Sequence, residues 1–533
     1  MKMIRLRQIK VRVSNKAMDE VMDIVARRLG IKVSDIISFK VVKRSIDARR
    51  KPDLYYSYIV DVLVDNENSV FNKVRPSNDI LMVSDEEYKF EAKGSKKLEN
   101  RPVVVGSGPC GLICGYMLAL YGYKPIIIER GKNVLERDKD VNLFWKTGKL
   151  DNNSNIQFGE GGAGTFSDGK LNTLIKDKNN YHRKVFEIFV ENGAPSEILY
   201  ENKPHIGTDL LKRVVSSIRN KIIELGGEVR FNTCLTDINI SNNKLESVVL
   251  NNKEVLPCDV LVLAIGHSAR DTIRMLYRKN IEMKAKPFAV GIRIQHKQEM
   301  INLSQYGVKY HKLLKAASYK LTARSSDGRG VYTFCMCPGG YVINASSEQG
   351  GLCVNGMSNY NRDSGNANSA VIVTVSPDDY GTSPMDGIEF QRKIEHKAYE
   401  LGRGKIPVSL FGDYKNNRIS SMFGSVKPVF KGNYEFCNVN DMFPDYINNA
   451  LKEGIISFDK KIKGFASDDA IIAGPEARTS SPVRIMRDDN GEASVLGIYP
   501  SGEGAGYAGG ITSAAIDGLV TFERIASVYK NFS

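Results

Sequence analysis

The sequence predicts an α/β protein with three parts: a discontinuous Rossmann-like domain, a mixed β-sheet domain inserted into it, and a small ferredoxin-like α/β module at the N-terminus. Three observations support this prediction. Residues 101–131 form a strand–glycine turn–helix–strand pattern, strands typical of a mixed sheet begin near residue 287, and residues 470–518 add a late strand, glycine turn and helix. Because 533 residues exceed what one hydrophobic core usually supports, we predict separate domains. Their predicted boundaries are 1–95 for the module, 96–280 and 465–533 for the Rossmann-like domain, and 281–464 for the inserted domain.

The unit at residues 101–131 has the pattern of a dinucleotide-binding site. Gly106 permits a tight turn, Gly108 lets the backbone approach a pyrophosphate, and Gly111 lets the helix pack closely on the strand. The second strand ends in Glu129, where a carboxylate can bind the hydroxyls of a ribose. The same glycine spacing recurs twice later in the chain, but neither repeat has both flanking strands. The first turn is therefore the predicted dinucleotide site.

The N-terminal module is predicted from alternating strands and one amphipathic helix. Apolar residues alternate over residues 3–13, 36–42 and 55–64, and they follow a helical spacing over residues 17–29. The basic segment 43–51 lies between two of the strands. We predict a solvated hairpin link there, with contact to phosphates or to a partner as the alternative.

Composition and charge restrict the class of protein. Hydrophobic residues make up 42% of the chain and charged residues 26%, and no apolar run is long enough to cross a membrane. Eight cysteines spread over the chain predict free thiols and a reducing cytoplasm. The net charge of +14 is compatible with nucleic acid as a partner, but nucleic acid is not favoured because no zinc finger, aromatic RNA-binding signature or long basic block is visible.

Two cysteines, Cys335 and Cys337, are the candidate catalytic residues. They lie one residue apart on a predicted strand, so their thiols are expected to point to opposite faces and not to form a disulfide with each other. One of them near a redox cofactor could act as a redox partner or as an acid. The alternative is that both are small buried residues beside a turn. No metal site is predicted, because the six histidines show no paired spacing.

Three distant stretches together resemble flavoproteins of the glutathione-reductase structural class. They are the first glycine turn with Glu129, the apolar strand that ends at Gly266, and the late turn around Glu503. A closer resemblance, over nearly the whole chain, is to a family of bacterial NAD(FAD)-utilising dehydrogenase-like FAD proteins. It rests on the segments FGEGGAGTFSDGKL (158–171), KPFAVGIRI (286–294), TFCMCPGG (333–340) and YPSGEGAGYAGGI (499–511), together with the SIDAR segment (45–49) of the N-terminal module.

The resemblance implies a set of residues that bind FAD. In the first turn and strand tip these are Gly106, Ser107, Gly108, Pro109, Cys110, Gly111, Glu129 and Arg130. In the middle of the chain they are Gly161, Gly162, Gly164, Thr165, Lys170, Leu171, Leu235, Ala264, Ile265 and Gly266. Near the C-terminus they are Gly502, Glu503, Gly509, Gly510 and Ile511, where a helix N-terminus favours the negative charge of a reduced flavin.

The function that this resemblance implies is a cytoplasmic FAD-dependent oxidoreductase that acts on an unidentified small-molecule substrate, without contact to a membrane. A second Rossmann unit for a nicotinamide is not visible, so NAD(P)H as a transient electron donor would have to enter the flavin pocket directly. Two alternatives stay open: a flavin-dependent RNA-modifying enzyme, suggested by the positive charge and the basic module, and a non-catalytic flavin-binding redox sensor. The sequence does not define the oligomeric state.

Overall fold

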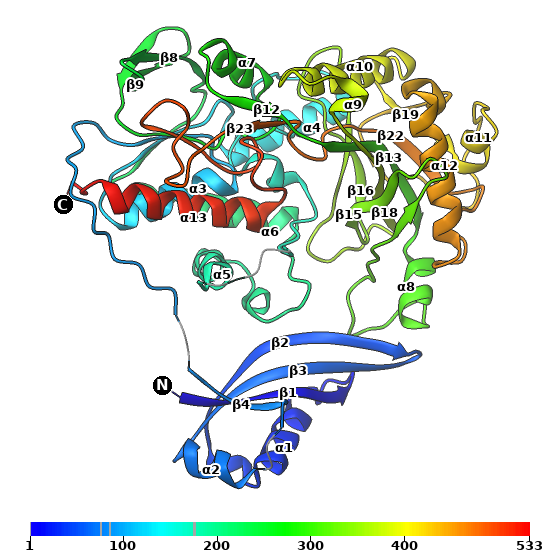
Figure 1. The fold of residues 1–533 in the computed structure, drawn as a ribbon. Coiled ribbons are helices and arrows are strands. Elements are labelled where there is room, and N and C mark those ends of the chain that lie inside the picture. The colour runs from blue at the N-terminus through cyan, green and yellow to red at the C-terminus, as the bar shows by residue number, and fades with distance from the viewer. Residues whose placement is uncertain (1, 75–76, 85–86, 174–176, 178, 533) are drawn as a thin grey trace.

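The computed structural model describes residues 2–74, 77–84, 87–173, 177 and 179–532. Figure 1 shows the N-terminal module, in blue, beside a larger body that holds one domain around a parallel sheet and one around a mostly antiparallel sheet. The predicted mixed α/β fold is confirmed.

The N-terminal module is a four-stranded antiparallel sheet with two helices. Its elements are β1 (Lys2–Arg12), α1 (Ala17–Leu29), β2 (Ile36–Arg50), β3 (Asp53–Val64), α2 (Glu67–Lys73) and β4 (Ile80–Ser84). The strand order β2-β3-β1-β4 and the succession βαββαβ are those of a split βαβ unit. Alternate apolar side chains of β1 and β3 and one face of α1 form its core.

The basic segment 43–51 lies at the end of a hairpin, as predicted, but it is not a link between strands, because β2 continues through it to Arg50. Arg44 pairs with Tyr58 and Asp47 pairs with Tyr55 across the hairpin, so the ladder with β3 extends to Arg50. Asp47 accepts hydrogen bonds from Lys10 (2.8 Å) and from Arg49 (2.8 Å to Nε). These ion pairs offset the repulsion between the basic side chains and let the segment remain a strand.

The module is attached to the larger body through β2. The backbone N–H of Arg44 donates to the carbonyl of Tyr200 (2.7 Å), and that of Asn202 donates to the carbonyl of Arg44 (2.8 Å). The guanidinium of Arg44 also donates to Glu201, 2.8 Å from Nε. The hydroxyl of Tyr56 in β3 donates to the carbonyl of Leu313 (3.2 Å).

The second domain is built on a parallel sheet with the order β24-β11-β5-β6-β7. Its strands are β5 (Val103–Val105), β6 (Ile126–Ile128), β7 (Glu228–Arg230), β11 (Leu261–Leu263) and β24 (Ile498–Pro500). One face is covered by α3 (Pro109–Leu120), α5 (Tyr181–Glu191), α6 (Thr208–Glu224) and α13 (Ile511–Val528). The other face packs against β8 (Leu235–Ser241), β9 (Lys244–Leu250), β10 (Glu254–Pro257) and α7 (Arg270–Arg278).

The C-terminal helix α13 lies alongside α3, as Figure 1 shows in red and light blue. Gly518 makes this close approach possible, since a Cβ there would lie 2.2 Å from the carbonyl oxygen of Cys110. The two segments of the discontinuous domain therefore pack as one core. The helix α4 (Val134–Thr147) follows β6 and precedes the glycine-rich segment, whose residues Gly162–Phe166 form a 3₁₀ turn.

The inserted domain is a seven-stranded sheet with the order β14-β15-β18-β13-β22-β19-β21. Its strands are β13 (Phe288–Lys297), β14 (Thr322–Arg324), β15 (Gly330–Cys337), β18 (Asn366–Val375), β19 (Ile406–Leu410), β21 (Tyr434–Phe436) and β22 (Ile471–Glu476). Shorter strands are β12 (Met283–Ala285) with β23 (Val483–Ile485), and β16 (Tyr341–Asn344) with β17 (Val354–Met357) and β20 (Phe430–Lys431). The helices are α8 (Gln298–Tyr306), α9 (Pro377–Tyr380), α10 (Asp386–Leu401), α11 (Phe411–Lys415) and α12 (Asp445–Asp459).

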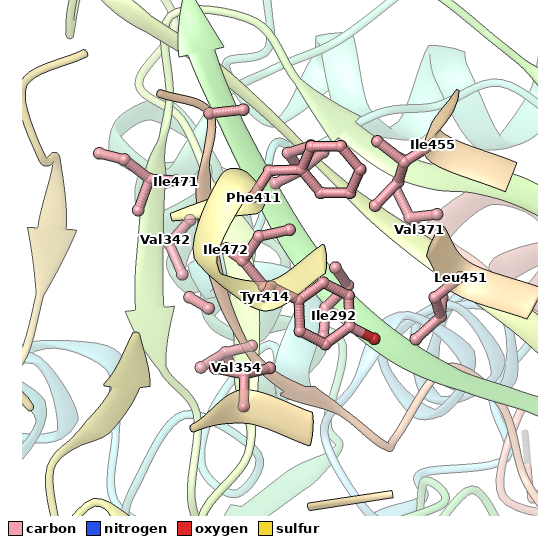
Figure 2. Close-up of a cluster of buried hydrophobic side chains, with 14 of the residues drawn as sticks. Ile292, Val342, Val354, Val371, Phe411, Tyr414, Leu451, Ile455, Ile471 and Ile472 are labelled. Carbon is pink, nitrogen blue, oxygen red and sulfur yellow. The ribbon is translucent and has the colours of Figure 1, made fainter. Parts of the chain in front are cut away.

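The core of the inserted domain joins its sheet to its helices. Figure 2 shows Ile292 of β13 and Ile472 of β22 close to Phe411 and Tyr414 of α11. The strand β22 pairs with β13 and β19, so it belongs to this sheet although the sequence placed it after the predicted boundary at residue 464. Periodicity alone shows that a buried strand exists but does not show which sheet it joins.

A buried ionic network connects the inserted domain to the parallel-sheet domain. The Glu395 carboxylate of α10 accepts hydrogen bonds from Arg270 of α7 (2.7 and 2.9 Å) and from Arg478 (2.8 and 2.9 Å). All three side chains are buried. Burial alone would raise the pKa of Glu395, but the two arginines outweigh it and hold the pKa well below its usual range.

We expect Glu395→Leu to destabilise the protein by about 3–5 kcal/mol, because it leaves Arg270 and Arg478 buried without their shared carboxylate. The measurement is urea unfolding followed by circular dichroism. Glu389→Leu is the matched control, since Glu389 on the same helix also pairs with arginines but is exposed. A Glu395 variant as stable as the control would show that the network contributes nothing to stability.

Candidate functional site

A cleft of about 340 Å³ lies outside the carboxyl ends of β5, β6 and β11. Parallel strands end at the same edge of a sheet, so the turns that follow them meet there. The walls come from the first glycine turn, the glycine-rich segment after α4, the turns after β7 and β11, the end of β15, and the segment that leads into α13. The inserted domain therefore completes a cleft that the parallel sheet begins.

Most of the residues predicted to bind the cofactor line this one cleft. They are Gly106, Gly108, Pro109, Cys110, Glu129, Arg130, Gly162, Gly164, Lys170, Leu235, Ala264, Ile265, Gly266, Glu503, Gly509, Gly510 and Ile511, together with the candidate catalytic residue Cys335. Six others do not line it: Ser107, Gly111, Gly161, Thr165, Leu171 and Gly502. Cys337 does not line it either. Segments separated by up to four hundred residues thus meet at one place.

The glycines of the first turn have two different structural roles. A Cβ at Gly111 would lie 1.9 Å from the carbonyl oxygen of Gly106, so this glycine allows helix and turn to pack together. Gly106 itself has a φ of 99° and passes close to Ala264 of the neighbouring strand. Gly108 is different, because only the Cα of Gly162 (3.8 Å) lies near its missing Cβ. Gly108 is thus the position where a ligand can approach the backbone.

Glu129 joins the first turn to the glycine-rich segment. One carboxylate oxygen accepts hydrogen bonds from the backbone N–H (2.9 Å) and the hydroxyl (2.8 Å) of Ser107. The other accepts from the N–H groups of Gly131 and Gly159, each at 3.0 Å. The dinucleotide pattern predicts that this carboxylate binds a ribose, but its four hydrogen bonds from three residues show that it also fixes the shape of the cleft.

Arg137 of α4 organises the glycine-rich segment, a role that no sequence pattern predicted. Its buried guanidinium donates to the carbonyls of Asn155 (2.8 Å), Ile156 (2.9 Å), Glu160 (2.7 Å) and Gly162 (2.9 Å). Burial lowers the pKa of Arg137 to about 10, so the group remains a cation at neutral pH. A helical arginine gives no local signal that it will bind a loop in this way.

The turn after β11 and the late turn form a second wall of the cleft. Nδ1 of His267 lies 3.1 Å from a carboxylate oxygen of Glu503, while its Nε2 is buried and has no hydrogen-bond partner within the described part of the chain. A Cβ at Gly266 or at Gly509 would meet nothing within 4 Å. This wall therefore combines an open glycine cradle with an unsatisfied polar atom, which fits a bound dinucleotide.

The two candidate cysteines do not point to opposite faces, and that expectation is wrong. Cys335 has a φ of 41°, and the pairing of β15 with β18 shifts between Phe334 and Cys337. This bulge interrupts the alternation of the strand. Sγ of Cys337 donates to the carbonyl oxygen of Cys335 (3.3 Å), and the Cys337 side chain is near enough to lower the pKa of the Cys335 thiol. Cys335 lines the cleft, and Cys337 is buried behind it.

A buried arginine supports these cysteines from β13. Arg293 donates to the carbonyl of Cys335 (3.2 Å), to Asn368 (2.7 Å) and to Glu476 (2.7 Å), and it lies 3.9 Å from Sγ of Cys337. The hydrogen bond from Cys337 lowers the pKa of Cys335, burial opposes this shift, and the charge of Arg293 adds to the lowering. Burial raises the pKa of Glu476 to about 7, against the effect of Arg293. The cleft therefore holds a thiol that ionises readily.

Neither a metal centre nor a membrane segment is found in the part of the chain that the structure describes. No group of three or more His, Cys, Asp and Glu residues there could hold a metal ion. Among the described helices none is both long and apolar enough to cross a membrane.

Comparisons with known proteins place the chain in a family. A protein of Clostridium beijerinckii (strain ATCC 51743 / NCIMB 8052), described as uncharacterized, is 50% identical over 529 residues, which cover 97% of this chain and 98% of that protein. The chain belongs to the family of this clostridial protein. Within it, residues 287–479 match the family "FAD-dependent protein, C-terminal domain-like", and residues 3–63 match a domain of unknown function.

Solved structures that the chain is similar to share little sequence identity with it, and their TM-scores are low. L-proline dehydrogenase from P. horikoshii is 15% identical over 81% of this chain and 93% of that one, with a TM-score of 0.32. Glycine oxidase from Bacillus cereus is 11% identical over 80% of this chain and 95% of that one, with a TM-score of 0.31. THI4 of Thermovibrio ammonificans is 20% identical over 34% of this chain, which spans 64% of that protein's length, with a TM-score of 0.24.

We expect Cys335 to be alkylated faster at neutral pH than Cys234, a half-buried thiol whose pKa is raised by burial. Because the thiolate is the nucleophile and the pKa of Cys335 is lowered, its reaction should persist as the pH falls from 9 to 6, with a rate about tenfold or more above that of Cys234. The measurement is a short iodoacetamide pulse analysed by mass spectrometry, with Cys335→Ser to verify the labelled site. Faster labelling of Cys234 would contradict the assigned environment of Cys335.

Proposed function

We propose that the protein is an FAD-dependent oxidoreductase that acts on a small-molecule substrate. The observation that carries this proposal is the convergence of three glycine turns, after β5, after β11 and before α13, on one cleft. The match of residues 287–479 to the FAD-dependent C-terminal family supports it independently.

The chain's own residues suggest how FAD would be held. The first turn and the N-terminus of α3 would bind the pyrophosphate through free backbone N–H groups. Glu129 and Leu235 would lie at the adenosine end, and Gly509, Gly510 and Ile511 would lie at the flavin end. The N-terminus of α13 stabilises negative charge, and a reduced flavin bound at this end of the cleft would carry negative charge close to it. FAD, when bound, would supply the electron transfer.

The finer assignment to the glutathione-reductase structural class rests on the parallel sheet. Residues 96–280 supply four of its strands and residues 465–533 supply β24, with the inserted domain between them. This supports a discontinuous FAD-binding domain. No second Rossmann unit occurs among the sheets of the described residues, so NAD(P)H as a donor would have to enter the same cleft.

We assign Cys335 and Cys337 as the catalytic pair beside the flavin end of the cleft. Cys335 presents a thiol of lowered pKa to the cleft, while the pKa of the buried Cys337 is raised by burial, so Cys337 keeps its proton. The pair can therefore hold one proton and one negative charge at neutral pH. The cysteines of the protein are free thiols, which supports a location in the reducing cytoplasm.

The first test is the visible spectrum of the protein after reconstitution with FAD, followed by addition of NADH or NADPH without oxygen. We expect the spectrum of a bound oxidised flavin. Bleaching would establish a nicotinamide-linked reductase, whereas a flavin that stays yellow with every donor while Cys335 and Cys337 change redox state would favour the sensor. No bound flavin after reconstitution would overturn the proposal.

Gly509→Val provides the matched test of the cleft. The valine side chain would extend into open space in the cleft, so the fold should be retained while FAD affinity falls about tenfold or more. Gly330→Val is the control, because a Cβ there also meets nothing within 4 Å but the residue lies outside the cleft. Equal FAD affinity in both variants would show that the cofactor binds elsewhere.

A further inference from the structure

A second cavity, of about 320 Å³, lies between the N-terminal module and the larger body. One wall is β2 with Arg44 and Ile46, and the facing wall comes from residues 195–205, 305–318 and 360–362. The cavity exists because β2 is hydrogen-bonded to Tyr200 and Asn202 along one edge. It is therefore a feature that the module and the body form together.

The charged residues around this cavity carry an excess of positive charge. Arg44, Lys203, Lys315 and Arg362 line it, against Glu197 and Glu201. Arg44 is paired with Glu201, and Arg362 is paired with Asp168 (2.5 Å) on the side of the first cleft. Asp168 also lies 4.0 Å from Lys170. If both are counted with the residues of the cavity, the cations still outnumber the carboxylates by two.

Two of these cations have no carboxylate partner within 4.0 Å among the described residues. Nζ of Lys203 donates only to the hydroxyl of Ser318 (3.2 Å), and Nζ of Lys315 lies 3.7 Å from the centre of the Tyr360 ring. Burial lowers the pKa of both lysines, and the nearby charge of Arg362 lowers them further. Crowding of like charges is unfavourable, and a bound anion would relieve it.

The histidine that lines the cavity, His205, does not add charge. Its Nε2 lies 3.0 Å from the carbonyl oxygen of Tyr360, and its ring stacks on the Tyr360 ring with centroids 5.3 Å apart. Burial lowers the pKa of His205 to about 3, so the imidazole is neutral at physiological pH. His205 therefore forms part of the wall, and the positive charge that would attract an anion comes from the lysines and arginines.

The rest of the cavity is suited to an organic group. Three tyrosines line it, Tyr56, Tyr306 and Tyr360, together with aliphatic residues that include Ile46, Leu313 and Leu314. Small-molecule sites typically combine such an apolar lining with a few polar groups that fix orientation.

We propose that this cavity binds a small phosphorylated organic molecule, with a phosphate monoester between Lys203 and Lys315 and its organic part against the tyrosines. A phosphate monoester with two negative charges would balance the excess of two positive charges. A carboxylate has one negative charge and would balance only half of that excess. This proposal does not depend on FAD binding. The two cavities are neighbours, because Lys170 of the first is paired through its backbone with His205 of the second.

The experiment is isothermal titration calorimetry of the full-length protein with phenyl phosphate, inorganic phosphate, benzoate and phenol at constant ionic strength. We expect phenyl phosphate to bind most tightly, inorganic phosphate and benzoate more weakly, and phenol least. No binding of phenyl phosphate at millimolar concentration, or equal binding of benzoate, would overturn the proposal.

The double variant Lys203→Gln/Lys315→Gln locates the site. Its affinity for phenyl phosphate should fall about tenfold or more, as expected for loss of charged hydrogen-bond donors. The control is Lys253→Gln/Lys463→Gln, which removes the same charge from two exposed positions outside the cavity. An equal loss in both double variants would indicate binding to the general positive charge of the protein and would contradict a built site.

Discussion

One buried carboxylate, that of Glu129, holds together the backbone segments that form the cleft. Glu129 follows β6 and accepts four hydrogen bonds, which connect the turn after β5, the tip of β6 and the glycine-rich segment at Gly159. Without it, three backbone segments would face one another with unsatisfied N–H groups, which is costly in a buried position. The same carboxylate that the dinucleotide pattern assigns to a ribose therefore also builds the wall on which a dinucleotide would lie.

The inserted domain contributes chemistry to a cleft that the parallel sheet shapes. The bulge in β15 turns Cys335 into the cleft and brings Cys337 close to it, while Arg293 of β13, paired with Glu476 of β22, donates to the carbonyl of Cys335. The network around Glu395 then ties the inserted domain to α7. The thiols are thus held by contacts within the inserted domain, and the Glu395 network holds that domain against α7.

Local patterns predicted what depends on local backbone geometry. The glycines of the first turn, the strand ending at Gly266 and the turn before α13 were all recognisable, and the structure brings them to one cleft. Long-range pairing was not predictable in the same way. The extension of β2 to Arg50 depends on its partner β3, and the bulge at Cys335 depends on β18 and Arg293. A period-two pattern describes an uninterrupted strand and contains no sign of such a bulge.

A structure of the protein with bound FAD would test the central claim most directly. We expect the pyrophosphate at the first glycine turn, the adenosine beside Leu235, and the flavin ring between Cys335 and the N-terminus of α13. Density for FAD at any other place, or an empty cleft in crystals grown with saturating FAD, would contradict it.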